Sequence, residues 1–160
     1  MIVLLTGMPG AGKSTVLREL AARGHAVEDL DYQGYSVLVE DQRRPVGWEQ
    51  LWDVARVRAR LDAHSEDVLF VAGTVSNRHE LRERFDAVVL LTAPRDVLLG
   101  RVAARADNPY GQDAASRAQV EHDIEVVEPV LRDEATHVVD TDRPAAQVAD
   151  EVERIGTRPR

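Results

Sequence analysis

Five short apolar runs alternating with segments of helical character constrain the fold more than any other feature of this 160-residue chain. The runs lie at residues 2–6, 25–31, 67–73, 87–92 and 137–141, and the second ends in acids. Runs that are apolar without strict alternation are typical of strands buried on both faces. The pattern predicts a five-stranded parallel sheet covered by helices on both faces. Ligands of such sheets bind beyond the carboxyl ends of the strands.

The segments between the runs supply the expected helices. Gly24 is the expected stop of the first helix, and Asn77 with Glu80 resembles a capped helix start. Pro129 must bend or end the ideal part of the helix marked by Val120, Ile124 and Val127. The other helices are expected at residues 13–23, at 48–63 from the spacing of Trp48, Trp52, Ala55 and Ala59, at 77–84, at 94–105 and from Pro144 to about 153. Residues 32–47 are weakly patterned, 107–113 are rich in turn residues, and the tail 156–160 is expected to fray.

Composition narrows the class of protein. The length favours a single domain over residues 1–160, and an apolar share of 44% is that of a globular protein. The absence of cysteine excludes disulfides and thiolate metal sites, and the five histidines are not spaced as zinc ligands. The net charge of −8 argues against nucleic-acid binding. No stretch resembles a membrane span or a secretion signal, so a cytoplasmic protein is expected.

Residues 7–15, GMPGAGKST, match the Walker A pattern G-x-x-x-x-G-K-[ST]. The match follows an expected strand and opens an expected helix, which is the context that this pattern requires. Glycines let successive backbone N–H groups point at one anion, and the helix N-terminus adds its positive dipole end. The sequence therefore predicts a triphosphate site built from Gly7, Gly10, Ala11, Gly12, Lys13, Ser14 and Thr15. An ordinary glycine-rich turn is the alternative, but such a turn does not require Lys and Ser at these two places.

Lys13 is the only lysine, although the chain has 20 Lys and Arg residues together. Lysine is a compact charge on a slim stem, whereas arginine is a broad planar fork that would fit a tight loop badly. Lys13 is therefore expected to reach the β- and γ-phosphates, and the Ser14 hydroxyl to ligate Mg²⁺.

Two acids lie at the end of the second apolar run, at the edge of the sheet where the glycine-rich loop lies. Asp29 and Asp31 would point the same way if both lay on the strand. One carboxylate can support Mg²⁺ and the other can accept a proton from an attacking hydroxyl. We assign the metal role to Asp29 and the base role to Asp31; solvent-facing acids at a strand end are the alternative.

With these features placed, the chain resembles the P-loop small-molecule kinases, including shikimate kinase, gluconate kinase and adenylate kinase-like proteins, over nearly its whole length. The layout is most similar to shikimate kinase, whose strand–loop–helix LLTGMPGAGKSTVLREL and D-x-D DLD are both present. The chain also resembles bacterial proteins of this size described as AAA family ATPases. The resemblance implies a three-layer α/β/α P-loop fold that uses ATP and Mg²⁺. It also implies a helical insertion at 32–64 that covers the acceptor, and a lid at 106–117.

The resemblance also implies nucleotide contacts near the lid. Arg101 falls where a family arginine packs on adenine, and Arg143 and Pro144 fall in the loop on the adenine side. Arg105 shares a helix face with Arg101 and would neutralise phosphate charge during transfer. Pairing with a neighbouring acid on an exposed helix is the alternative for Arg105. Arg117, after the lid, is a weaker candidate.

The acceptor half departs from shikimate kinase. Its acceptor loop has three consecutive glycines, whereas this chain has Gly73-Thr74-Val75, and Val127 and Asn108 stand where the family has arginines. A locally basic segment, Arg43, Arg44, Arg56, Arg58 and Arg60, suits an acidic or phosphorylated acceptor, although a solvated helix face is the more common place for any one of these arginines. Trp48 and Trp52 are expected in the core or stacked on an acceptor, and Tyr32, Tyr35, Ser76 and Asn77 are candidate cleft residues.

These inferences lead to an ATP- and Mg²⁺-dependent phosphotransferase that acts on a small-molecule acceptor through a hydroxyl or phosphate group, working as a monomer or homodimer. The alternative is a nucleotide-binding regulatory module or slow ATPase without such an acceptor.

Overall fold

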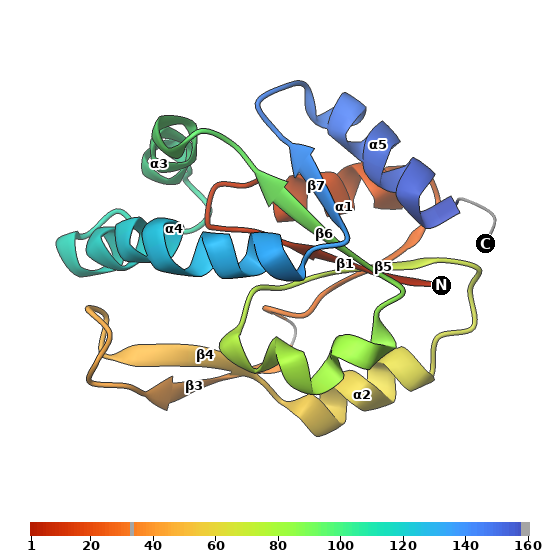
Figure 1. The fold of residues 1–160 in the computed structure, drawn as a ribbon, viewed down its shortest axis with the longest axis horizontal. Helices are drawn as coiled ribbons and strands as arrows, with labels where there is room; N and C mark the ends of the chain where they lie inside the picture. Colours follow the sequence, from red (N-terminus) through yellow and green to blue (C-terminus); the bar gives the residue numbers. More distant parts are fainter. Residues whose placement is uncertain (33, 158–160) are drawn as a thin grey trace.

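The computed structural model describes residues 1–32 and 34–157, and its centre is a five-stranded parallel sheet (Figure 1). The strand order is β2-β5-β1-β6-β7. This confirms the expected sheet. The strands are β1 (Ile2–Thr6), β2 (Ala26–Asp29), β5 (Leu69–Ala72), β6 (Ala87–Thr92) and β7 (His137–Asp140).

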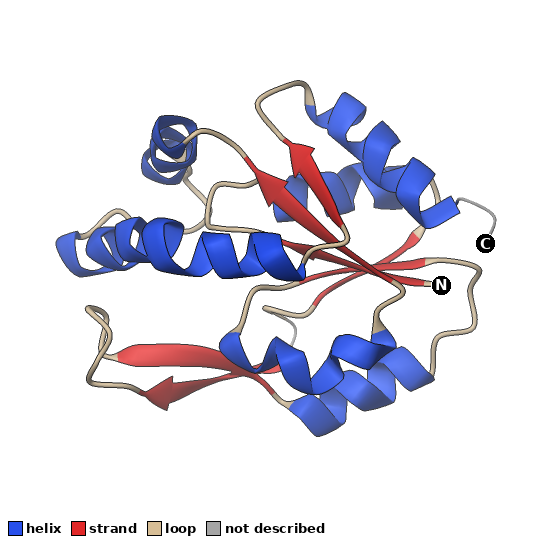
Figure 2. Ribbon diagram, viewed as in Figure 1, coloured by secondary structure: helices blue, strands red, loops and turns tan. Residues whose placement is uncertain are grey.

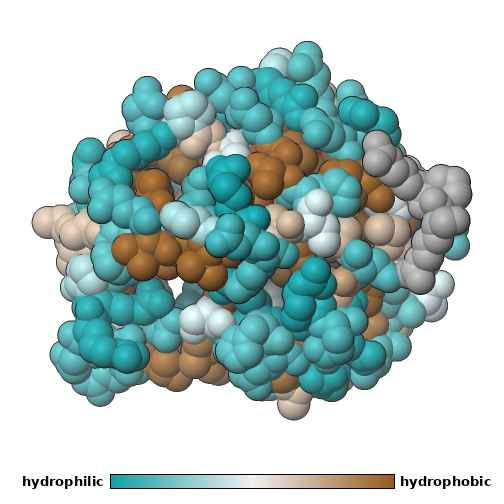
Figure 3. Space-filling model, in the orientation of Figure 1, coloured by the Kyte–Doolittle hydropathy of each residue, from teal (hydrophilic) through white to brown (hydrophobic). Residues whose placement is uncertain are grey.

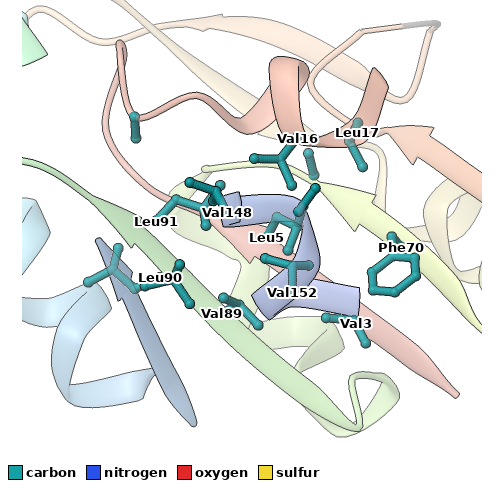
Figure 4. Packing of buried hydrophobic residues seen from close by; sticks show 14 of the residues in the cluster. Val3, Leu5, Val16, Leu17, Phe70, Val89, Leu90, Leu91, Val148 and Val152 are labelled. Carbon is teal, nitrogen blue, oxygen red and sulfur yellow. The ribbon is translucent and has the colours of Figure 1, made fainter. Parts of the chain in front are cut away.

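Alternate residues of β1 supply two cores, one on each face of the sheet. Val3 and Leu5 pack against α1 (Lys13–Ala22) and α5 (Ala145–Thr157), as Figure 4 shows. Leu4 faces the other way, into a cluster formed with α2 (Val54–Asp62) and the 3-10 helix η1 (Ser76–Arg84). Because both faces of a central strand are fully buried, its residues need no polar alternation.

Two further helices lie on the β6–β7 side of the sheet (Figure 1). They are α3 (Arg95–Ala104) and α4 (Ala114–Glu134). Pro129 lies inside α4, which continues to Glu134, so of the two expected effects, a bend or an end, the helix does not end there. The part of the chain that the structure describes contains no helix that could span a membrane.

The segment 32–64 differs from the helical insertion expected from the sequence. It contains an antiparallel hairpin, β3 (Ser36–Glu40) paired with β4 (Trp48–Trp52), and only then α2 (Figure 2). The expected helix over 48–63 is therefore wrong in its first third. Trp48 and Trp52 share a face in a strand as well as in a helix, because even-numbered residues of a strand point the same way. The helix begins after Asp53, whose side chain accepts from the Arg56 amide at 3.1 Å.

Smaller corrections concern the helix ends. The segment 76–84 begins after Val75, so Asn77 does not cap it. The Asn77 side-chain amide instead accepts from the backbone N–H of Trp52 and donates to the backbone carbonyl of Trp52, both at 3.0 Å. At the end of the chain, Gly156 and Thr157 belong to α5, and the remaining residues of the expected frayed tail lie outside the described residues.

Candidate active site

A cleft of about 1030 Å³ opens at the carboxyl ends of the parallel strands. The phosphate loop, the first turn of α1 and the ends of β2 and β5 form its floor, while the β3–β4 hairpin, the loop before α4, and α4 form its walls. Figure 3 shows the molecule hollowed between the hairpin and α4. This is the edge where parallel sheets bind ligands, as the sequence predicted.

The glycine-rich loop has the backbone that an anion cradle requires. Gly10 and Gly12 have φ angles of +83° and +93°, which only glycine adopts without strain. Gly12 is the N-cap of α1, and no side chain of the described residues caps this helix. The amide groups of the first turn of a helix have no partners within the helix. They are thus available to an anion at the floor of the cleft, which Gly7, Gly10, Ala11, Gly12, Lys13, Ser14 and Thr15 all line.

Lys13 lies across this loop. Its ammonium group donates to the Gly7 carbonyl at 2.5 Å and to the Met8 carbonyl at 3.5 Å. Desolvation lowers the pKa of Lys13, and Arg105 lowers it further, while the charges of Asp31 and Asp29 raise it. The ammonium group therefore lies at the phosphate loop with two carboxylates nearby.

Ser14 and Asp29 form the pair expected to hold Mg²⁺. The Ser14 hydroxyl donates to Asp29 Oδ2 at 3.2 Å. The described residues contain no cluster of three or more His, Asp or Glu side chains that could hold a metal alone. Protein Mg²⁺ sites commonly use one or two oxygen ligands and take the rest from phosphates and water. The all-oxygen pair beside the phosphate loop therefore fits Mg²⁺ bound together with a nucleotide.

Asp31 lies in a turn two residues beyond the end of β2 and not on the strand, so strand alternation does not orient it. Its backbone amide donates to Asp29 Oδ1 at 3.2 Å, and this turn holds the two acids together. Both carboxylate oxygens of Asp31 accept from the Thr74 amide, each at 3.1 Å. Burial raises the pKa of Asp31 to about 6, against a lowering effect of the Lys13 charge.

Thr74 is a cleft residue to which the sequence analysis gave no role of its own. Its hydroxyl donates to the Gly7 carbonyl at 2.9 Å and accepts from the Gly7 amide at 3.2 Å. Thr74 thus connects Asp31 to the phosphate loop. Its position after the third apolar run, at the same sheet edge as both, is the signal that could have indicated this role.

Gly73 precedes Thr74 and lets a tryptophan approach the site. A Cβ atom at Gly73 would lie 2.5 Å from Cζ2 of Trp52 and 3.1 Å from Oδ1 of Asp31. The Trp52 indole is buried in the cluster formed with α2 and η1, and the core was one of the two places expected for the tryptophans. A residue larger than glycine at position 73 would therefore displace the Trp52 indole.

The predicted nucleotide-side residues come together at the other end of the cleft, with one exception. The Arg101 guanidinium donates to the Gly10 carbonyl at 3.3 Å and to the Thr141 carbonyl at 2.7 Å. Arg143 donates to the Asp140 carbonyl at 2.9 Å. Arg101 and Arg143 line the cleft, but Pro144 does not. The adjacent Ala145, the first residue of α5, lines the cleft instead.

Arg105 lies just past the end of α3, where the chain turns into the expected lid. It lines the cleft and donates to the Tyr110 carbonyl at 2.5 Å. The Asn108 amide reaches across the cleft to donate to the Tyr32 hydroxyl at 3.0 Å. The lid loop and the segment after β2 are therefore already in contact. Arg117, by contrast, pairs with Glu121 at 3.2 Å and does not line the cleft.

The basic segment does not form a basic acceptor pocket. Arg43 pairs with Asp41, Arg58 with Glu83, and Arg60 with Glu28. Arg56 packs over the Tyr35 ring, 5.8 Å from its centre. Of the five arginines, only Arg44 lines the cleft, so the other four do not support the expectation of an acidic or phosphorylated acceptor, which stays a prediction. Trp48, Tyr32 and Ser76 line the cleft, whereas Tyr35 and Asn77 do not.

Known proteins resemble this chain over most of its length. A family model described as an AAA domain matches residues 3–122. The shikimate kinase of Nitrobacter winogradskyi is 34% identical over 156 residues, covering 92% of this chain and 72% of that protein. The shikimate kinase of Rhodopseudomonas palustris is 32% identical over 157 residues, covering 93% and 77%.

Solved structures share the fold. The shikimate kinase from Acinetobacter baumannii in complex with shikimate superposes with a TM-score of 0.64 at 24% identity, covering 96% of this chain and 91% of that one. TT1252 from Thermus thermophilus gives a TM-score of 0.62 at 18% identity, covering 97% and 95%. At these identities the structural matches establish the architecture alone. Taken with the sequence relatives and the phosphate loop, they show that this chain belongs to the family of P-loop small-molecule kinases that includes the shikimate kinases.

Proposed function

We propose that this kinase transfers the γ-phosphoryl group of ATP to a hydroxyl group of a small-molecule acceptor. The observation that carries the proposal is the position of Asp31. A carboxylate held by the Thr74 amide, and joined through Thr74 to the phosphate loop, is placed to take the proton of an attacking hydroxyl.

The triphosphate would bind along the amide groups of residues 7–15, with Lys13 against the β- and γ-phosphates. Ser14 and Asp29 would hold Mg²⁺ there. Such an ion neutralises charge on the β- and γ-phosphate oxygens. The adenine would lie toward Arg101 and Arg143, on the side of the cleft formed by the loop after β7.

In the transfer, the acceptor oxygen attacks the γ-phosphorus as the bond to the β-phosphate oxygen breaks. The acceptor proton passes to Asp31, and ADP and the phosphorylated acceptor are the products. Lys13 and Arg105 would offset the negative charge on the transferring group. The contact between Asn108 and Tyr32 would help exclude water, which otherwise competes with the acceptor.

The test is ADP release from ATP and Mg²⁺ with a panel of sugars, acids, nucleosides, nucleoside monophosphates and amines. A kinase of this kind releases ADP many times faster when its acceptor is present. ADP release that no acceptor class stimulates, with ATP bound normally, would contradict the proposal.

A slow ATPase or regulatory module is the second candidate. The neutral Asn108, bound to the Tyr32 hydroxyl at a place where the shikimate kinase family has a lid arginine, favours it. Such a module would hydrolyse ATP at the same low rate with every small molecule and would respond to a protein partner instead. A cytoplasmic location and a monomeric or homodimeric state remain predictions.

A further inference from the structure

The wall of the cleft formed by the hairpin is not positively charged, although it contains an arginine. Arg44 pairs with Glu49 at 2.7 Å and approaches Asp41 at 3.7 Å. Two carboxylates thus share one guanidinium. Because these groups are at most partly exposed, little positive charge remains for an acidic ligand.

Arg78, a second arginine of the cleft lining, is also neutralised. Arg78 donates to Glu134 at 2.7 Å and 3.0 Å, and to the Val75 carbonyl at 2.9 Å. The neighbouring Val127 of α4 contributes an apolar surface to the cleft.

Asp123 of α4 adds a carboxylate to the lining of the cleft. The Gln119 amide donates to Asp123 Oδ1 at 2.7 Å. Within residues 1–32 and 34–157, no lysine, arginine or histidine forms an ion pair with Asp123. Burial raises the pKa of this carboxyl, Gln119, Arg44 and His122 lower it, and Glu49 raises it. The charged groups that face Asp123 and Tyr110 are Glu49, Asp113, Arg44, Arg105 and His122, so three carboxylates, Asp123 included, stand against two guanidinium groups.

Two aromatic rings stand beside this carboxylate. The ring centres of Trp48 and Tyr110 are 5.8 Å apart, with the planes at 53°. Trp48, Tyr110 and Asp123 all line the cleft, and burial, together with the charge of Asp123, raises the pKa of Tyr110 to about 12. Aromatic rings combined with a carboxylate are a typical environment for an organic cation.

Strand β4 connects this end of the cleft to the proposed base. The Gln50 amide donates to the Asp31 backbone carbonyl at 2.7 Å, and Trp48 lies two residues away on the same face of the strand. Two residues of a strand span about 7 Å. A ligand of sugar size could therefore place a hydroxyl at Asp31 and a second group near Trp48 and Asp123.

We propose that the acceptor is a small hydroxyl-bearing amine, of the amino-sugar or amino-alcohol class, whose ammonium group binds Asp123 beside the Trp48 and Tyr110 rings. This proposal rests on the proposed kinase function and names the acceptor class for the same site. It replaces the acidic acceptor that the arginine-rich sequence suggested.

The test compares acceptors that differ only in one substituent. Glucosamine, glucose and glucuronate form one matched set, and amino alcohols with the corresponding diols and hydroxy acids form further sets. With ATP and Mg²⁺, we expect kcat/KM for ADP release to be about tenfold or more higher for the amines than for the neutral compounds, and lowest for the acids.

Variants of two acids on one helix then locate the ammonium site. Asp123→Asn should raise KM for the amine about tenfold or more, while the KM for ATP stays unchanged. Asp133→Asn is the matched control, because Asp133 lies on α4 outside the cleft lining. Trp48→Leu is the second variant and should also raise the amine KM. Circular dichroism of each variant separates these effects from misfolding.

The outcomes distinguish this proposal from the function on which it rests. Acids or neutral compounds that are used as well as the amines would overturn the amine class while leaving the kinase intact. An amine KM that Asp123→Asn and Trp48→Leu both leave unchanged would overturn the ammonium site. ADP release that no compound in any set stimulates would overturn the kinase function itself, and this proposal with it.

Discussion

The Thr74 amide donates to both carboxylate oxygens of Asp31, at 3.1 Å each. The hydroxyl of the same threonine bonds to the carbonyl and the amide of Gly7. One residue therefore sets the distance between the proposed base and the phosphate loop. In-line phosphoryl transfer depends on this distance, because misplacing a reacting group by about 1 Å can cost about 100-fold in rate.

Replacing Thr74 tests this connection. Thr74→Val keeps the shape and the amide but removes the hydroxyl bonds to Gly7. We expect a loss of about 1–3 kcal/mol in the free energy of unfolding, because buried polar groups of the loop lose partners, and a fall in kcat of about tenfold or more. Thr74→Ser should restore both in urea unfolding and ADP-release assays. Equal activity in the valine variant would show that the hydroxyl does not position the site.

The packing around Gly73 leaves no room for a larger side chain at this position. Gly73→Ala brings a Cβ atom to 2.5 Å from the Trp52 indole, so the ring or the loop must move. Forcing an extra carbon into a packed region costs about 1–3 kcal/mol. We expect a lower melting temperature and a shifted tryptophan emission spectrum. Gly100→Ala is the control, since a Cβ there meets nothing within 4 Å. An unchanged spectrum with an unchanged melting temperature in Gly73→Ala would contradict the packing.

Lys13 should determine nucleotide affinity. Lys13→Met keeps the aliphatic stem and removes the charge that faces the phosphate loop. We expect the affinity for ATP, measured by calorimetry, to fall about tenfold or more, with the fold intact by circular dichroism. Arg58→Met is the matched control, because Arg58 pairs with Glu83 outside the cleft. If Lys13→Met binds ATP like the wild type, Lys13 does not contribute to nucleotide binding.

Glu153 should give the stability of the fold a dependence on pH. Its carboxylate pairs with His25 at 2.6 Å and with Arg23 at 2.7 Å, and these bonds join α5 to the region after α1. Hydrogen bonds from His25 and Arg23 lower the pKa of Glu153. A carboxyl whose pKa is lower in the folded state stabilises the fold above its unfolded pKa, and this contribution disappears as the pH falls through the folded pKa.

The wild type should therefore melt at a higher temperature than Glu153→Gln at pH 7, and the difference should shrink as the pH falls below about 4. Melting curves of both proteins across this pH range provide the measurement. A difference that stays constant with pH would mean that ionisation of Glu153 does not contribute.

The parallel sheet and the phosphate loop could be predicted because each has a local signature. Val3, Leu4 and Leu5 are all buried, so their strand is apolar without interruption. Gly12 must adopt a left-handed backbone before a helix, so its place in the loop is visible in the sequence. Features of this kind depend on neighbours in sequence, and the sequence alone determines them.

The hairpin and the acceptor end could not be predicted in the same way. Trp48 and Trp52 are four residues apart, a spacing that places them on one face of a helix and also on one face of a strand. The cross-strand pairing with β3 decides between the two. Likewise, the ion pairs of Arg58 and Arg60 are formed with Glu83 and Glu28, which lie far away in sequence. A charge count cannot show which arginines are neutralised.

The catalytic role of Asp31 can be tested most directly by comparing Asp31→Asn with the wild type in one experiment. ATP affinity is measured by calorimetry, and acceptor-dependent ADP release with the best acceptor of the panel, with Asp133→Asn as the control. We expect Asp31→Asn to bind ATP nearly as well as the wild type, while the kcat of this variant falls about 100-fold or more. An asparagine variant that retains the wild-type kcat would contradict the assignment of Asp31 as the base.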